Sequence, residues 1–255
     1  MIEIRSVTIP ELSDERRNLY IYLPAAAQRE PERRFPVLYM FDGHNVFFDA
    51  HATYGRSWRL GEYLDRTNTP LIVAAIECSH LPGARISEYA PFSFRDSELG
   101  DVTGRGGLTV EWIVNVMKPL IDSAYPTLPD RSHTFIAGSS MGGLMSLYAV
   151  SEYNHIFSRC AALSPSIIFG GTELDNYIQR ADFGRDTVVY MDYGERELGE
   201  RNTPARWRSV SSLLLRKNVL LTARIVPDGQ HCEASWERQI PFFMDTLLYP
   251  ARARK

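Results

Sequence analysis

One stretch, residues 133–150, constrains the fold of this chain more than any other. Its central residues, Gly138 to Gly142, follow the pattern G-x-S-x-G with Ser140 in the middle. A short apolar run precedes them and a helix-like pattern follows, which is the context of a nucleophile elbow. The glycines would leave room for a sharp, strained turn, and Ser140 would lie at a helix N-terminus, where backbone N–H groups favour developing negative charge. The stretch predicts a nucleophilic serine; the alternative is a glycine-rich turn with an incidental serine.

The other segments alternate between strand-like and helix-like patterns. Near-continuous apolar runs indicate strands buried on both faces of a parallel sheet, at Pro36–Phe41, Leu71–Ile76, His133–Ala137, Thr187–Met191 and Leu220–Val226. Two earlier segments, Ile2–Ile9 and Asn18–Leu23, have the pattern of antiparallel strands, and a shift of apolar parity predicts a bulge in the first. Helical patterns are found at Trp58–Arg66, Leu108–Tyr125, Thr203–Lys217 and Glu233–Leu248.

This order of elements predicts the fold. Strands that alternate with helices form a mostly parallel central sheet with helices on both faces, joined by right-handed crossovers. With antiparallel N-terminal strands, this is the layout of an α/β-hydrolase, and the length suffices for one such domain over residues 1–255. Pro119 predicts a kink and Pro241 a bend or restart in their helices, while Thr203 as N-cap and Pro204 predict the start of another.

The connection Cys78–Gly107 is unusually long and rich in glycine and proline. Loops of this length in compact domains are usually functional or disordered. Tyr89, Phe92 and Phe94 stand there beside charged residues such as Arg85. The composition predicts an ordered, semi-polar wall of a substrate pocket, with a solvated surface excursion as the alternative.

A nucleophilic serine needs a base and an orienting acid, which follow it along an α/β-hydrolase chain in the order serine, acid, histidine. His231 follows the last apolar strand and precedes the last helix, so it is the expected base, whereas His155 has the position of a helix-end residue. The other histidines precede Ser140: His44, His51, His80 and His133.

The acid is expected on the loop after Thr187–Met191, where the sequence leaves three carboxylates open. Asp192 stands at the strand end, where a buried structural role is an alternative. Glu195 and Glu197 lie farther out, where a side chain can reach the histidine loop. Any of the three is also compatible with a solvated loop charge.

Two backbone N–H groups should form the oxyanion hole. One belongs to Met141, directly after the nucleophile. The other should come from the loop after Pro36–Phe41, where Gly43 lets the chain turn and aim either the His44 amide or its own at the substrate. We expect no metal site at His44 with Asp49 and His51, because no further compact ligand cluster accompanies them, and we expect no cofactor.

The composition excludes several other functions. A net charge of −3 without a Lys/Arg stripe gives no electrostatic case for nucleic acid. No run of about 18 apolar residues is present, so we expect no membrane span, and the N-terminus lacks a secretory signal pattern, which favours a cytoplasmic location. An odd cysteine count without a C-x-x-C pair argues against a disulfide framework and a structural zinc site.

Taken together, these motifs resemble the putative-esterase family of α/β-hydrolases, which includes enterobactin, feruloyl and acetyl-xylan esterases, S-formylglutathione hydrolases and mycolyltransferases. The resemblance covers residues from about 37 to 245. The matching segments are Val37–Gly43, Arg85–Pro91, Gly138–Tyr148, Ala162–Pro165, Gly194–Glu197 and His231–Trp236.

The resemblance implies a serine carboxylesterase that acts through an acyl-enzyme on a small-molecule ester. It implies Ser140 as nucleophile and His231 as base, and it favours Glu197 as the acid and the His44 amide as the second oxyanion donor. Expected substrate-pocket residues are Gly43, Arg85, Tyr89 and Trp236.

Three other functions are compatible with the same fold. An acyltransferase would replace water by an alcohol or sugar acceptor, and the sequence does not separate it from a hydrolase. A peptidase lacks support here. A non-catalytic binding module is disfavoured because Ser140 and His231 are both present. Siderophore, phenolic, short acyl and thioester substrates stay open, and the oligomeric state is not encoded.

Overall fold

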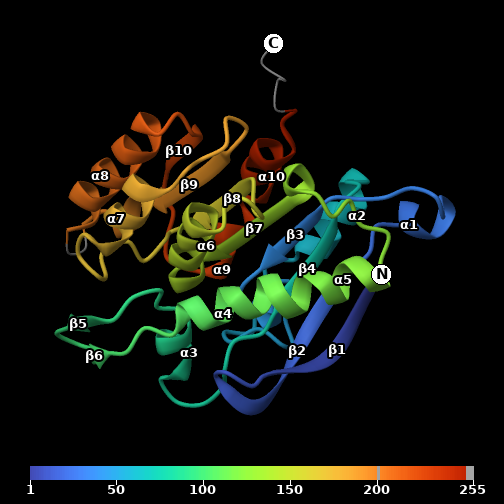
Figure 1. Cartoon of the computed structure of the whole chain (residues 1–255), viewed down its shortest axis with the longest axis horizontal. Helices are drawn as coiled ribbons and strands as arrows, with labels where there is room; N and C mark the ends of the chain where they lie inside the picture. Colours follow the sequence, from blue (N-terminus) through green and yellow to red (C-terminus); the bar gives the residue numbers. More distant parts are fainter. Residues whose placement is uncertain (200–201, 251–255) are drawn as a thin grey trace.

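An eight-stranded sheet forms the centre of the computed structural model, which describes residues 1–199 and 202–250 (Figure 1). Its strands are arranged in the order β1 (Ile2–Ile9), β2 (Ser13–Tyr22), β4 (Ile72–Ile76), β3 (Val37–Met40), β7 (Thr134–Ser139), β8 (Arg159–Leu163), β9 (Val188–Gly194) and β10 (Leu220–Val226).

Strand directions follow the predicted pattern. Within this sheet the β1–β2 and β2–β4 pairs are antiparallel, and the other pairs are parallel. The register of β1 against β2 is continuous from Ile2 to Val7 and shifts between Val7 and Ile9, so the irregularity lies after the parity change from which the bulge was predicted. Strand β2 begins at Ser13 rather than Asn18, because its polar first half continues the hairpin with β1.

One central strand, β8, was not predicted. Its sequence Arg159–Leu163 begins with arginine and has two alanines, so it lacks the bulky apolar run expected of a buried strand. All five residues are nevertheless buried, and the Arg159 guanidinium donates a hydrogen bond to the Tyr249 carbonyl at 2.8 Å. Its small side chains leave room for the helices on both faces.

Helices cover both faces of the sheet, as predicted, and each face has its own apolar core (Figure 1). Successive residues of β3 show the alternation: Tyr39 belongs to one core, and Leu38 and Met40 to the other. The larger core packs against α4 (Gly106–Trp112), α5 (Lys118–Ala124), α6 (Met141–Glu152), α7 (Glu173–Arg180) and α8 (Thr203–Arg216). The other packs against α2 (Leu60–Thr67), α9 (Glu233–Glu237) and α10 (Ile240–Leu248).

Prolines divide two of the expected helices. A π-helical segment, Ile113–Met117, separates α4 from α5, and Pro119 lies in the first turn of α5. The wider turn accommodates a residue that cannot donate a backbone hydrogen bond. Pro241 likewise lies in the first turn of α10, which follows α9 as a separate helix.

The expected N-cap of α8 was wrong. Thr203 is the first helical residue, and the cap position belongs to Asn202, whose side chain makes no capping hydrogen bond. Helix α7 and the short helix α1 (Ala26–Arg29) were not predicted.

The long connection after β4 is ordered. It contains α3 (Ala84–Glu88) and the hairpin of β5 (Phe94–Asp96) and β6 (Gly100–Val102), which projects from the body of the fold in Figure 1. A buried ion pair ties it to the sheet: the Arg17 guanidinium on β2 lies 2.8 Å from a Glu88 carboxylate oxygen. Glu88 also accepts a hydrogen bond from the Ser79 amide at 2.7 Å.

None of the described helices combines the length and hydrophobicity required to cross a lipid bilayer.

Replacement of Arg17 by methionine should test this anchor. The side chains of Arg17 and Glu88 are 1% and 4% exposed, so the substitution leaves a buried carboxylate without its partner. We expect the free energy of unfolding to fall by about 3–5 kcal/mol in denaturant titrations. Arg16→Met, at the exposed neighbouring position, is the matched control and should change it by less than about 0.5 kcal/mol. Equal effects of the two variants would contradict the anchoring role.

Candidate active site

Ser140 occupies a strained turn between β7 and α6. Its backbone has φ 56° and ψ −124°, a combination that residues with a side chain rarely adopt. The two motif glycines permit the close approach, because a Cβ on Gly138 would lie 2.7 Å from the Gly142 carbonyl carbon. The Ser140 amide donates to the Leu163 carbonyl at 2.9 Å, which ties the turn to the end of β8.

Three predicted side chains meet at this turn. The Ser140 hydroxyl oxygen lies 2.9 Å from Nε2 of His231, and Nδ1 of His231 lies 2.7 Å from Oε2 of Glu197. His231 comes from the loop between β10 and α9, and Glu197 from the 3₁₀ turn Glu195–Glu197 after β9. The side chain of His231 is 46% exposed, whereas that of Glu197 is 7% exposed. The imidazole therefore faces solvent on one side and a buried carboxylate on the other.

The Glu197 carboxyl is held in its ionised form. Burial alone would raise its pKa, but hydrogen bonds from His231, from the Ser164 hydroxyl at 2.7 Å and from the Gly194 amide at 2.8 Å outweigh burial and lower the pKa. An ionised partner at Nδ1 fixes the imidazole orientation and leaves Nε2 free to accept a proton from Ser140.

The other two candidate carboxylates are engaged elsewhere. Asp192, buried at the end of β9, accepts hydrogen bonds from the Ser164 amide at 3.1 Å and the Tyr190 hydroxyl at 2.7 Å. Burial raises its pKa to about 7. Glu195 accepts a hydrogen bond from the Asp228 amide at 3.0 Å. Neither carboxylate hydrogen-bonds His231 within the described residues.

Ser164 supports the Glu197 carboxylate and was not predicted to have a role. Its hydroxyl donates to Glu197 and accepts a hydrogen bond from the Trp236 indole N–H at 3.1 Å. The Trp236 ring meets the His231 ring edge-on, with centroids 5.1 Å apart. Because Ser164 directly follows β8, the missed strand also concealed this residue; its only sequence signal was the segment Ala162–Pro165.

The two expected oxyanion donors lie on opposite sides of the Ser140 turn in sequence. The Met141 amide opens α6, and the His44 amide belongs to the 3₁₀ turn Gly43–Asn45 after β3. Neither amide donates a hydrogen bond to another residue of the described chain. Only glycine fits at position 43, because a Cβ there would lie 2.4 Å from the Ala75 carbonyl oxygen.

Arg85 and Tyr89 hold the residue before that turn. The Arg85 guanidinium donates to both Asp42 carboxylate oxygens at 2.7 Å, and the Tyr89 hydroxyl accepts from the Asp42 amide at 3.1 Å. These contacts fix Asp42 in a left-handed conformation, φ 55°. The long connection therefore positions the turn that carries the His44 amide.

A cavity of about 450 Å³ opens beside Ser140 and His231. It is lined by Asp42, Asn45, Thr53, Tyr54, Arg85, Ser139, Ser140, His231, Cys232, Glu233 and Trp236. Two of the expected pocket residues, Arg85 and Trp236, line this cavity. Gly43 and Tyr89 do not: Gly43 packs against the Ala75 backbone, and Tyr89 is buried behind Asp42.

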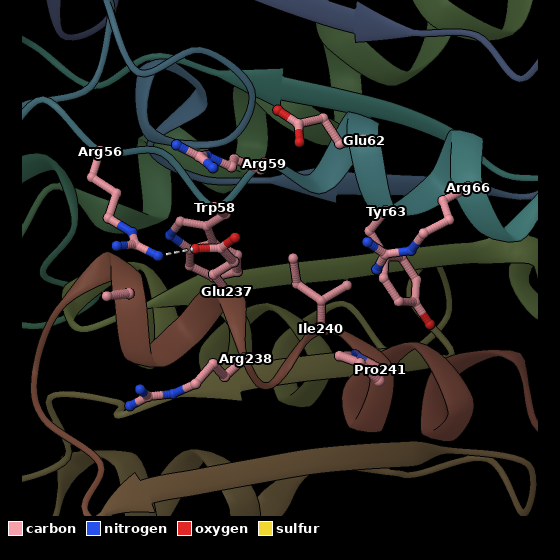
Figure 2. A pocket seen from close by; sticks show the side chains of 11 residues that line it. Arg56, Trp58, Arg59, Glu62, Tyr63, Arg66, Glu237, Arg238, Ile240 and Pro241 are labelled. Carbon is pink, nitrogen blue, oxygen red and sulfur yellow. Dashed lines mark hydrogen bonds and ion pairs between the residues drawn. The ribbon is translucent and has the colours of Figure 1, made fainter.

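A second cavity, of about 390 Å³, is lined in part by Ala234 and Glu237 of α9 (Figure 2). It is rich in arginine, and the Arg56 guanidinium pairs with Glu237 at 2.6 Å. The rings of Trp58, which lines this cavity, and Trp236, which lines the first, are 5.9 Å apart. It contains none of the predicted site residues.

One buried cluster near the site has the residue types of a metal centre. Ligand atoms of Asp42, His44 and Cys78 lie within 4.8 Å of one another. However, both Asp42 oxygens bind the Arg85 guanidinium, a cation that opposes a metal ion there. Burial also raises the pKa of the Cys78 thiol, whereas a metal needs the thiolate. We assign no metal to this cluster.

The strain at Ser140 can be measured by comparing two substitutions. Ser140→Gly and Ser140→Ala both remove the hydroxyl, but only glycine relieves the unfavourable backbone conformation. We expect the glycine variant to have the higher free energy of unfolding, by about 1 kcal/mol, because relief of strain exceeds the added entropy of the unfolded chain. A less stable glycine variant in denaturant titrations would show that the turn is relaxed.

Comparisons with known proteins identify the fold and the family. The uncharacterised protein YbbA of Bacillus subtilis (strain 168) is 25% identical over 195 residues, which cover 74% of this chain and 72% of YbbA. A ferulic acid esterase structure superposes with a TM-score of 0.70 and 17% identity over 97% of this chain and 98% of its own.

The enterobactin esterase FES of Shigella flexneri, solved in the presence of enterobactin, superposes with a TM-score of 0.74 and 16% identity over 97% of this chain and 58% of its own. At such identities these structures establish the α/β-hydrolase fold. The family model described as putative esterase matches residues 10–242. Since that match spans most of the sequence, the chain belongs to the putative-esterase family.

Proposed function

We propose that this enzyme hydrolyses small-molecule carboxylic esters through an acyl-enzyme formed on Ser140. The observation that carries the proposal is the continuous hydrogen-bonded chain from Glu197 through His231 to Ser140, which ends at the wall of a cavity. A serine next to a neutral imidazole, itself oriented by a buried carboxylate, is the arrangement that activates a hydroxyl for attack on a carbonyl.

Acylation begins when Nε2 of His231 takes the hydroxyl proton as the Ser140 oxygen attacks the ester carbonyl carbon. The tetrahedral intermediate collapses, the carbon–oxygen bond to the alcohol breaks, and the imidazolium protonates the departing alkoxide. A water molecule then attacks the acyl-enzyme with His231 again as base, and the carboxylic acid leaves as Ser140 regains its proton. Throughout, the Glu197 carboxylate stabilises the transient imidazolium.

Backbone dipoles provide the second part of the catalysis. The amides of Met141 and His44 would donate to the carbonyl oxygen as it gains negative charge, and the N-terminus of α6 adds its dipole. The Arg85–Asp42 fork and Tyr89 would keep the His44 amide in place, because they hold the residue that starts its turn.

Water is the acyl acceptor that the geometry supports best. The His231 side chain is 46% exposed, so solvent reaches the base that must activate the acceptor. Structurally similar proteins bear the names of ferulic acid and enterobactin esterases, and their substrates are ester compounds. For this chain we infer only that its substrates contain an ester bond.

Substitution of the three side chains should separate their roles. With p-nitrophenyl acetate, butyrate and octanoate, we expect Ser140→Ala to lower kcat by about 10⁴-fold or more and Glu197→Gln by about 10³–10⁴-fold, because glutamine cannot stabilise the imidazolium. Glu195→Gln removes the same charge two residues away, outside the hydrogen-bonded chain, and serves as the matched control with activity near that of the unmodified enzyme.

A fluorophosphonate probe offers a second readout, since it reacts with an activated serine. The unmodified enzyme should be labelled, and Ser140→Ala should not. Labelling or ester turnover that persists in a folded Ser140→Ala variant would contradict the mechanism.

A further inference from the structure

Glu233 is a buried carboxylate that the proposed mechanism does not use. It stands two residues after His231 at the start of α9, is 6% exposed and lines the catalytic cavity. Its own backbone amide donates to it, but no other residue of the described chain forms a hydrogen bond or ion pair with its carboxylate. Burial raises the pKa of this carboxyl, which reflects the energetic cost of an uncompensated charge.

The other charged side chains of the cavity compensate one another. Arg85 and Asp42 form a two-pronged ion pair, with both hydrogen bonds at 2.7 Å. His231 must be neutral to act as a base. The cavity wall therefore carries one net negative charge, on Glu233, and the electrostatic field of that charge favours a cation and disfavours an anion.

Two aromatic side chains line the same cavity. Trp236 is buried with its indole held by Ser164, and Tyr54 is 81% exposed at the rim. Aromatic faces attract ammonium groups, Trp most strongly, and the attraction grows as the site is desolvated. A carboxylate and two rings around one cavity are complementary to an organic cation.

We propose that the catalytic cavity selects esters that carry a positively charged ammonium group, which Glu233 binds together with Tyr54 and Trp236. The proposal rests on the ester hydrolysis argued above and names a substrate class for it. The ammonium group can belong to the acyl or to the alcohol portion of the ester, and the probes below distinguish the two.

The test uses pairs of esters that differ only by a nitrogen or a carbon atom at one centre. Butyrylcholine and 3,3-dimethylbutyl butyrate place the charge or its neutral counterpart in the alcohol. The 4-nitrophenyl esters of 4-(trimethylammonio)butanoate and 5,5-dimethylhexanoate place it in the acyl group. For each pair, the readout is the ratio of kcat/KM for the cationic and neutral esters, measured by pH-stat or nitrophenol release.

We expect Glu233→Gln to lower this ratio about 10-fold in at least one pair, because the substitution removes the charge but keeps the side-chain volume. Comparison of the same two esters in two enzymes cancels their different intrinsic reactivities. Tyr54→Leu, at an exposed position that does not threaten folding, should lower the ratio about 3-fold through loss of the ring.

Glu237→Gln is the matched control. Glu237 lies four residues farther along, also on α9, but its carboxylate faces the arginine-rich cavity and pairs with Arg56 at 2.6 Å (Figure 2). The variant removes the same charge from the same helix outside the catalytic cavity. It should retain the ratio of the unmodified enzyme, which shows that the effect is local to Glu233.

Unchanged ratios in Glu233→Gln for both pairs would overturn the proposal. If kcat fell equally for cationic and neutral esters, Glu233 would act on His231 and not on the substrate, and the proposal would again be wrong. Failure of the underlying function has a different signature: none of the four esters would be turned over, or turnover would persist in Ser140→Ala.

Discussion

Backbone hydrogen bonds that continue the parallel sheet past the ends of its strands place the reactive groups of this enzyme. The Ser140 amide donates to the Leu163 carbonyl at 2.9 Å, and the Ser164 amide donates to the Asp192 carbonyl at 3.0 Å. Each bond fixes the first residue after one strand against the last residues of the next. Ser140 and Ser164 are therefore held by the sheet register and not by flexible loops.

The buried hydroxyl of Ser164 links several side chains of the site. It bridges the Glu197 carboxylate and the Trp236 indole, and the indole in turn meets the His231 ring. Glu197 and His231 thus share one support, although they follow different strands. Arg85 and Tyr89 in turn fix Asp42 and with it the turn that carries the His44 amide. Long-range contacts brace both halves of the site.

Much of this was predictable because its signals are local. Five consecutive residues indicate the sharp turn at Ser140. Chain order and the last apolar strand indicate His231 among the six histidines. The local sequence does not distinguish Glu197 from Asp192. Asp192 is buried at the strand end and accepts a hydrogen bond from the Tyr190 hydroxyl, and both features depend on tertiary packing.

Other features were not predicted from the sequence, for physical reasons. The middle of strand β8, residues 160–162, consists of small residues, so the sequence has no bulky apolar run there, and Ser164 was missed together with the strand. Tyr89 was expected in the cavity because aromatic residues often line pockets, whereas it is buried behind Asp42. The burial of Glu233 has no counterpart in sequence, since a glutamate at the start of a helix is ordinarily solvated.

The arrangement of the strands has a consequence for the evolution of this protein. Ser140, Ser164, Glu197 and His231 follow four adjacent strands, β7 to β10, at one end of the sheet. Insertions or deletions where the crossover helices return to the opposite end would leave that register intact. Loop length can therefore drift on one side of the molecule while the chemistry on the other side stays fixed, so that divergent sequences retain a common reactive centre.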